Sequence, residues 1–148
     1  MRRSLLFIPG NNPGMLQNAS IFNADGVILD LEDAVSIHDK DSARLLVQNF
    51  LESFPVNDIE VIVRINGLDT DFYTEDIAAI MGENLDAIMV PKAHSHDLIK
   101  LDSLLSNYES KLGLSKSIKL IPIIELATSL LEVEAIAKLP RVDGILLG

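Results

Sequence analysis

The chain has 148 residues, of which 48% are hydrophobic and 23% are charged, with 12 basic against 22 acidic side chains. This length suits one domain with a real core, and the hydrophobic fraction excludes an intrinsically disordered chain. The formal charge of −10 argues against nucleic acid as a partner, and no apolar run approaches the roughly 20 residues that a membrane-spanning helix needs.

Cysteine usage and the start of the chain indicate the compartment. The sequence contains no cysteine, which excludes disulfides, thiolate zinc sites and cysteine nucleophiles. The apolar stretch before Pro9 is too short for the core of a secretory signal peptide. The composition therefore predicts a soluble, cytoplasmic globular domain.

Short, continuously apolar runs alternate with longer amphipathic stretches along the chain. The runs are Ser4–Ile8, Gly26–Leu31, Glu60–Ile65, Asp86–Val90, Ile118–Ile124 and Gly144–Leu147. Their continuous apolar character predicts strands buried on both faces, as in a parallel sheet. The intervening stretches predict helices over Gly14–Asn23, Asp39–Ser53, Asp71–Met81, Ser95–Leu112 and Thr128–Lys138. The predicted order is a strand–helix unit repeated along the chain and closed by a final strand.

Two α/β architectures fit this order. An open doubly wound sheet is complete at this length, whereas a (β/α)8 barrel needs about 250 residues. In an open sheet, only the strands beside the switch point should carry functional groups at their carboxyl ends. Here five of the six runs are followed by polar or flexible residues. We therefore predict a partial (β/α)8 TIM barrel, its first six strands and five helices, with the open doubly wound sheet as the alternative.

Arg64 and Glu125 each follow a strongly apolar run. A guanidinium at a strand end suits a carboxylate or an enolate, and the alternative is a structural ion pair. An unpaired carboxylate in an apolar setting is costly, so Glu125 indicates a metal or substrate role. Its alternatives are a helix N-cap and a salt bridge.

An acidic cluster follows the second run. Alternation along a strand places Asp30 and Glu32 on one face and Asp33 on the other. We expect one of them to be catalytic and another to cap a helix or pair with Lys92. Lys92 itself fits a substrate contact and a structural counter-ion equally well. Asn66, which precedes a glycine, is interpreted as a substrate contact or as part of a simple turn.

Five blocks of the sequence resemble, in order, those of the HpcH/HpaI aldolase superfamily. The blocks are RSLLFIPGNNPGML, GVILDLEDAV, VIVRINGLDT, IMVPKA and LIPIIELA, and the resemblance covers essentially the whole chain. The first and third blocks point to the branch of the citrate lyase beta subunits, which are citryl-thioester lyases. Malyl-CoA and citramalyl-CoA lyases share the framework. One departure is Leu126-Ala127, where the family usually has Ser or Thr directly after the glutamate.

The resemblance implies a (β/α)8 barrel and a set of site residues. Arg64 matches the substrate-binding arginine, Glu125 the ligand of metal and substrate, and Glu32 and Asp33 the acidic block. The second magnesium ligand of the family is an aspartate about three residues beyond the glycine that matches Gly148. The resemblance thus implies catalytic roles for Arg64, Asp33 and Glu32.

The resemblance also implies an organisation and a reaction for the whole protein. Residues 1–148 are expected to be the N-terminal portion of a TIM-barrel lyase domain whose C-terminal part is absent. The reaction is Mg²⁺-dependent cleavage of a citryl thioester to oxaloacetate and an acetyl thioester. The acyl group of the thioester is attached to coenzyme A or to an acyl carrier protein. The expected partners are the acyl carrier and transferase subunits of a citrate lyase complex, and further copies of the chain, because open sheet edges pair readily.

Two other classes of function remain open from the residues. One is a non-catalytic relic or regulatory subunit that folds as an open six-stranded domain. The other is a receiver-like domain, suggested by the acidic cluster and Lys92. Receivers place their acidic pair after the first strand and their acceptor aspartate after the third. Those positions here carry PGNN and Arg64, so the receiver hypothesis ranks last.

Overall fold

One parallel sheet organises the chain. The computed structural model describes residues 2–53 and 59–148, and within them the sheet has six strands in the order β1-β2-β3-β4-β5-β6. The strands are β1 (Leu5–Pro9), β2 (Gly26–Asp30), β3 (Glu60–Arg64), β4 (Ala87–Val90), β5 (Lys119–Ile124) and β6 (Leu146–Leu147). All neighbouring pairs are parallel, and all six lie within a residue or two of the predicted runs.

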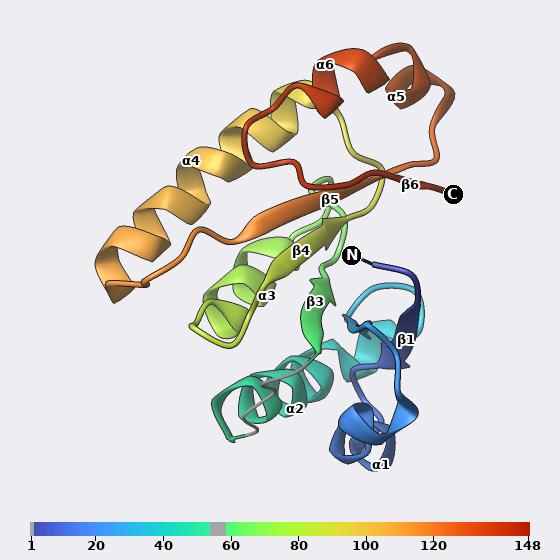
Figure 1. Cartoon of the computed structure of the whole chain (residues 1–148), viewed down its shortest axis with the longest axis vertical. Helices are drawn as coiled ribbons and strands as arrows, with labels where there is room; N and C mark the ends of the chain where they lie inside the picture. Colours follow the sequence, from blue (N-terminus) through green and yellow to red (C-terminus); the bar gives the residue numbers. More distant parts are fainter. Residues whose placement is uncertain (1, 54–58) are drawn as a thin grey trace.

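The strand order decides between the two predicted architectures. A doubly wound sheet reverses its order at a switch point, whereas each strand here pairs with its neighbour in sequence. Every crossover therefore advances in the same direction, and the sheet curls into a half-barrel with helices around the outside (Figure 1). The prediction of a partial barrel is confirmed, and the open doubly wound alternative is wrong.

Three predicted helices are confirmed, with ends close to those expected. They are α2 (Lys40–Ser53), α3 (Tyr73–Ile80) and α4 (Ser95–Leu112), and a 3₁₀ turn, η2 (Ile37–Asp39), leads into α2. Helix α2 packs against α3 and against the short helix α1 (Pro13–Gln17). These contacts arrange consecutive helices side by side along the sheet.

Two of the predicted helices are each interrupted once. The stretch Gly14–Asn23 forms α1 and then a 3₁₀ turn, η1 (Ala19–Phe22). Asn18 Nδ2 donates to the carbonyl of Gly14 at 2.8 Å. The side chain thus takes the acceptor that the backbone N–H of Asn18 would use in a longer helix. The helix ends there for that reason.

The second break lies in the stretch Thr128–Lys138, which forms α5 (Ala127–Leu131) and α6 (Val133–Ala137). Glu132 lies between the two helices, and its carboxylate reaches across to the start of α4. Glu132 Oε2 accepts hydrogen bonds from the backbone N–H of Ser95 at 2.9 Å and from its hydroxyl at 2.7 Å. This contact joins α6 to α4.

The Glu132 contact makes a pH-dependent contribution to stability. Hydrogen bonds from the Ser95 hydroxyl and backbone N–H lower the pKa of Glu132 to about 2, against about 4.3 for a glutamate in an unfolded chain. The contribution is therefore complete above the unfolded pKa and is lost as the pH falls towards 2. We expect Glu132→Gln to show a smaller fall in the urea midpoint than the parent chain between these pH values. The control is Glu134→Gln, which removes an exposed carboxylate of α6; parallel curves for parent and Glu132→Gln would contradict the prediction.

Side chains of the strands form two apolar layers. Those that point outward pack beneath the helices, among them Val27, Leu29, Val61, Val63, Ile88 and Val90. Those that point inward form a separate cluster of Ile28, Ile62, Ala87, Met89, Ile121 and Ile123. Burial on both faces explains why the strands are continuously apolar in sequence. The inner cluster supports the functional groups described below.

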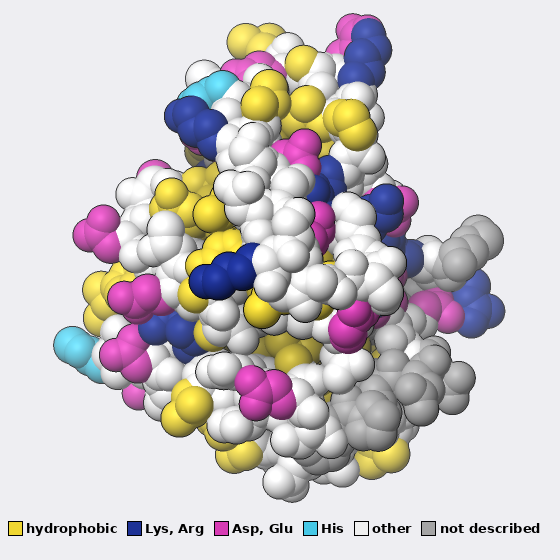
Figure 2. Space-filling view, turned by 90° about the vertical axis from the view of Figure 1, so that its left-hand side faces the viewer, with side chains coloured by type: hydrophobic (Ala, Val, Ile, Leu, Met, Phe, Trp, Pro, Cys, Tyr) yellow, Lys and Arg dark blue, Asp and Glu magenta, His cyan; other side chains and the backbone are white. Residues whose placement is uncertain are grey.

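The outer face is mixed in character. Figure 2 shows the side of the molecule on which α3 and α4 lie, with acidic, basic and apolar side chains interspersed and none of them forming one large patch. In the described part of the chain, no helix combines the length and the apolar character that crossing a membrane requires.

Candidate active site

Four side chains at the carboxyl end of the sheet belong to its inner face. Alternation gives Asp30 the orientation of Ile28, and Arg64 that of Ile62, both members of the inner cluster. Phe7 pairs with Ile28, and Glu125 is two residues beyond Ile123, so the same alternation places both on this face. The strand ends thus bring together groups from β1, β2, β3 and β5, as expected for the functional end of a barrel.

Arg64 and Asp30 form a bidentate ion pair at the centre of this end. Arg64 Nε donates to Asp30 Oδ1 at 2.7 Å and Nη2 donates to Oδ2 at 2.6 Å. The Asp30 side chain is only 1% exposed and that of Arg64 15% exposed. The guanidinium carbon also lies 5.0 Å from the centre of the Phe7 ring, which is a cation–π contact. The structural ion pair that was the alternative for Arg64 is therefore present, and Nη1 stays outside it.

Asp30 also organises the turn that follows β2. Its two oxygens accept hydrogen bonds from the backbone N–H groups of Glu32 and Ala34, both at 2.9 Å. Burial alone would raise the pKa of Asp30, but the bonds from Arg64 and from these N–H groups outweigh it and hold the pKa below its ordinary value. Asp30 therefore stays ionised and keeps both the guanidinium and the turn in place. The sequence prediction placed Asp30 in the acidic cluster but did not assign it this role.

Glu32 and Asp33 both face the free end of the guanidinium. Arg64 Nη1 lies 3.3 Å from Glu32 Oε2 and 3.7 Å from Asp33 Oδ2. The expectation that Asp33 would occupy the opposite face is wrong, because β2 ends at Asp30 and the alternation does not continue through the turn. The Asp33 side chain is 80% exposed, against 13% for Glu32.

Glu32 is the carboxyl of the site whose proton affinity is raised. Burial raises the pKa of Glu32 above its ordinary value, and the charges of Asp33, Glu125 and Asp30 add to this against the opposing effect of Arg64. Glu125 and Glu32 thus belong to one electrostatic cluster. A buried carboxyl with a raised pKa among other carboxylates is a candidate for proton transfer.

Glu125 lies directly after β5 and is exposed. The argument that it stands in a costly apolar setting is therefore wrong for this chain. Its Oε1 accepts a hydrogen bond from the backbone N–H of Lys92 at 2.8 Å. A Cβ placed on Gly148 would lie 3.2 Å from Cβ of Glu125, so the end of β6 approaches this carboxylate closely. Glu125 also lines a cavity of about 230 Å³ between β6 and α5.

Lys92 contributes its backbone to the site. It is one of two residues other than glycine with a positive φ in the described ranges, at 50°, and this turn aims its N–H at Glu125. Its side chain is exposed, and among the described residues no ion pair joins it to a carboxylate. The predicted substrate contact of Lys92 stays a prediction.

Asn66 lies beneath the site rather than open to it. It is buried, and both its backbone N–H and its Nδ2 donate to Asp76 Oδ2, at 2.9 and 2.7 Å. The other oxygen of Asp76 accepts from Arg44 Nε at 3.1 Å. Asn66 is thus held by a buried network, and its predicted role in substrate binding stays a prediction.

Two buried cations of α2 were missed from the sequence. Lys40 Nζ donates to the carbonyls of Leu31 and Glu32, both at 2.7 Å, and burial lowers its pKa below the ordinary value. Arg44 holds Asp76 as described above. A signal existed, because Lys40 and Arg44 are four residues apart, and so lie on one face of the helix, and Arg44 directly follows Ala43, which is buried in α2.

The donor chemistry of the site suits a hard cation. Glu32 and Glu125 offer carboxylate oxygens, which Mg²⁺ prefers. Within residues 2–53 and 59–148, however, no three Asp, Glu, His or Cys side chains form a group that could hold a metal ion. The described residues thus fit magnesium in ligand type and supply only part of a ligand set.

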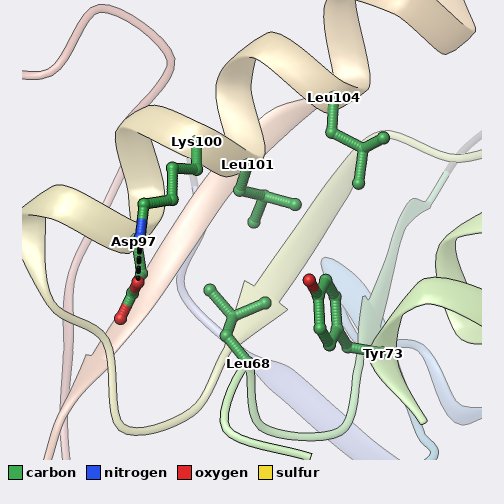
Figure 3. A pocket seen from close by; sticks show the side chains of 6 residues that line it. All are labelled: Leu68, Tyr73, Asp97, Lys100, Leu101 and Leu104. Carbon is green, nitrogen blue, oxygen red and sulfur yellow. Dashed lines mark ion pairs between the residues drawn. The ribbon is translucent and has the colours of Figure 1, made fainter. Parts of the chain in front are cut away.

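A further pocket lies on the outer face, away from these groups. Figure 3 shows Leu68 and Tyr73 facing the start of α4, with the Lys100–Asp97 ion pair at the rim. The pocket has a volume of about 180 Å³, and Leu101 and Leu104 of α4 complete its lining. None of the predicted site residues reaches it.

Comparison with known proteins identifies close relatives of the chain. The profile of the HpcH/HpaI aldolase/citrate lyase family matches residues 3–148. The citrate lyase subunit beta of Leuconostoc mesenteroides subsp. cremoris is 46% identical over 114 residues, which are 76% of this chain and 38% of that protein. The citrate lyase subunit beta of Haemophilus influenzae is 37% identical over all of this chain and 52% of its own length. An L-malyl-CoA/beta-methylmalyl-CoA lyase of Cereibacter sphaeroides is 36% identical over 99% of this chain and 48% of that protein.

Solved structures share the fold. The citrate lyase beta subunit of M. tuberculosis, complexed with oxaloacetate and magnesium, superimposes with a TM-score of 0.75 and 29% identity over 97% of this chain and 56% of that one. The CitE protein of Mycobacterium tuberculosis in complex with magnesium, acetoacetate and coenzyme A gives a TM-score of 0.78 and 26% identity, over 100% of this chain and 50% of that one. The chain thus spans about half the length of these relatives.

Proposed function

This chain belongs to the HpcH/HpaI aldolase/citrate lyase family. We therefore propose that it forms the part of a carbon–carbon lyase that supplies the substrate-binding arginine and the carboxylates of the active site. The proposed substrate is a citryl thioester, and the products are oxaloacetate and an acetyl thioester. The observation that carries the proposal is the ion pair of Arg64 and Asp30, which leaves Nη1 facing Glu32 at the functional end of the half-barrel. We further propose that residues 1–148 are the N-terminal portion of a longer TIM-barrel domain.

Arg64 is proposed to bind the substrate and to stabilise charge in the cleavage step. Cleavage begins with loss of the substrate's hydroxyl proton, after which the carbon–carbon bond breaks and the thioester fragment leaves as its enolate. Asp30 holds the guanidinium in advance, so little reorganisation is needed as negative charge develops near Nη1. Arg64 thus acts by electrostatic stabilisation and orientation.

Glu32 and Asp33 are the proposed proton-transfer groups. The raised pKa of Glu32 suits an acid or base that exchanges a proton during the reaction. Asp33 is exposed and lies at the rim of the same guanidinium. We assign neither of them alone as the base.

Glu125 is the proposed ligand of Mg²⁺. Glu32 lies close enough to Glu125 for the charge of Glu125 to raise its pKa. When bound, Mg²⁺ supplies a Lewis acid that polarises the substrate's oxygens and lowers the cost of deprotonating the hydroxyl. The family aspartate expected about three residues beyond Gly148 would join Glu125, because Gly148 already packs against that side chain. Lys92 and Asn66 complete the proposed substrate-binding set, Lys92 at the Glu125 side and Asn66 from beneath.

The carrier of the thioester and the partners belong to the same proposal. Coenzyme A or an acyl carrier protein is the proposed carrier, and the acyl carrier and transferase subunits of a citrate lyase complex are the proposed partners. We propose that copies associate and that the protein works in the cytoplasm. The malyl-CoA lyase relatives support a second candidate, cleavage of malyl-CoA or citramalyl-CoA by the same groups.

A substrate panel tests the proposal. The full-length polypeptide that carries this sequence is purified and offered citryl-CoA, malyl-CoA and citramalyl-CoA with Mg²⁺. Oxaloacetate, glyoxylate and pyruvate are each measured by a coupled assay. We expect the highest kcat/KM with citryl-CoA and complete loss of turnover when EDTA removes the metal.

The other outcomes of the panel separate the candidates. Preference for malyl-CoA or citramalyl-CoA would favour the second candidate. Absence of cleavage with all three, in a folded protein supplied with magnesium, would favour the relic or regulatory subunit. The coding sequence just beyond codon 148 is read first, since an aspartate within a few residues would supply the expected second ligand.

A further inference from the structure

Helix α2 carries two buried cations on one face, close to its start. Lys40 and Arg44 are four residues apart, so they project from successive turns of the same side of the helix. Both are buried, although lysine and arginine are seldom buried unless a partner compensates their charge. Neither is part of the reaction proposed above.

Lys40 is bonded to the loop on one side of Arg64. Its Nζ donates to the carbonyls of Leu31 and Glu32, each at 2.7 Å. These carbonyls belong to the turn after β2, which carries Glu32 to within 3.3 Å of Arg64 Nη1. The ammonium thus fixes the backbone of the turn that carries the acidic groups.

Arg44 is bonded, through Asp76, to the loop on the other side of Arg64. Arg44 Nε donates to Asp76 Oδ1 at 3.1 Å, and Asp76 Oδ2 accepts from the backbone N–H of Asn66 at 2.9 Å. Asn66 is two residues beyond Arg64 at the end of β3. The guanidinium of Arg44 thus fixes the backbone that leaves the site on that side.

We propose that the first turns of α2 are a clamp that holds the two loops flanking Arg64, with Lys40 and Arg44 as positioning residues. A misplacement of about 1 Å in a catalytic group can cost about a hundredfold in rate, which gives such a clamp a functional value beyond stability. Each cation serves one loop, so the two halves of the clamp are separable. Loss of one half should loosen one loop and spare the other.

Amide hydrogen exchange in the full-length protein, without substrate, tests the clamp. The reporter amides for the first loop are Glu32 and Ala34, whose N–H groups donate to Asp30, and for the second loop Asn66. We expect Lys40→Met to speed exchange at Glu32 and Ala34 by about tenfold or more and to leave Asn66 nearly unchanged. Arg44→Met should do the reverse, so each variant is the matched control for the other.

The exchange experiment can overturn the clamp in two ways. Equal acceleration of all three reporter amides in both variants would mean general destabilisation of the fold. Unchanged exchange at the variant's own loop would mean that the contact does not hold it. If Arg44→Met does not fold, Arg44→Lys replaces it, because a cation then remains beside Asp76.

An activity measurement extends the test, and this arm alone rests on the proposed function. In folded protein, Lys40→Met and Arg44→Met should each lower kcat/KM by about 10- to 100-fold, as loss of supporting groups around a site typically does. The control is Lys116→Met, because Lys116 pairs with Asp86 at the opposite end of the strands, and its kcat/KM should stay within about threefold of the parent. Normal kcat/KM in both clamp variants would overturn their positioning role. A parent protein without lyase activity would defeat the proposed function and leave the exchange result standing.

Discussion

Arg64→Ala is expected to lower kcat/KM of the full-length protein for the proposed substrate by about a thousandfold, as loss of a preorganised charge-stabilising donor does. The structure places the Arg64 guanidinium within 3.7 Å of carboxylate oxygens of Asp30, Glu32 and Asp33. Its removal takes away both the proposed substrate contact and the positive charge that is proposed to offset the developing enolate. The measurement is steady-state cleavage of citryl-CoA, with oxaloacetate detected by a coupled assay.

Two further variants separate chemistry from folding in this experiment. Arg64→Ala strands the buried carboxylate of Asp30, so the double variant Arg64→Ala/Asp30→Asn removes both charges, keeps an oxygen that can accept from the turn after β2, and should fold better while staying inactive. The matched control is Arg3→Ala, because Arg3 pairs with Asp25 near the amino end of β1 and its side chain is 76% exposed. Turnover within about tenfold of the parent in folded Arg64→Ala would defeat the assignment of Arg64.

Arg141→Met is expected to lower the free energy of unfolding by about 3 kcal/mol, the usual effect of breaking a buried ion pair from one side. Arg141 lies before β6, and its side chain is 8% exposed. It joins three segments of the fold: α4, the start of β5 and the residues before β6. Its partners are Asp102, Ser106, Glu109, Ser117 and the carbonyl of Ile118.

The physical reason for this effect is the position of Glu109. The Glu109 side chain is 14% exposed, so it loses its counter-ion with little access to water. Methionine retains the length of the side chain and offers none of the lost donors. The measurement is the urea midpoint and slope of the variant against the parent.

Lys138→Met is the control for this measurement, because Lys138 forms an exposed pair with Glu134 of α6. Its free energy of unfolding should change by less than about 0.5 kcal/mol. If Arg141→Met proved as stable as Lys138→Met, the Arg141 network would not be a structural junction.

Much of the fold could be predicted from local pattern. The apolar runs identified all six strands, and α4 begins and ends at the predicted residues. Continuous burial and the period of the helices depend on residues close in sequence, which explains this success. The two broken helices escaped prediction: in the first, the Asn18 side chain takes the carbonyl of Gly14, and in the second, Glu132 between the helices bonds to Ser95 of α4, a contact between residues 37 apart in the chain.

The candidate site was predictable in composition and less so in arrangement. Glu32, Asp33 and Arg64 were predicted as site residues and lie together. The placement of Asp33 opposite to Glu32 failed, because the turn after β2 ends the alternation. Glu125 was expected in an apolar setting and is exposed, since its surroundings depend on how β6 and α5 pack.

The strand segments, their order along the chain, three of the helices and the polar groups at the strand ends could be predicted from the sequence, because each of these follows from the pattern of neighbouring residues. The absence of a switch point in the sheet depends on the three-dimensional fold, since strand order is a property of pairing between distant segments. The fold also brings Asp30 to Arg64, a contact between residues 34 apart in the chain. The burial of Lys40 and Arg44 has the same origin, because a cation is stable there only where carbonyls or a carboxylate from another segment replace its water.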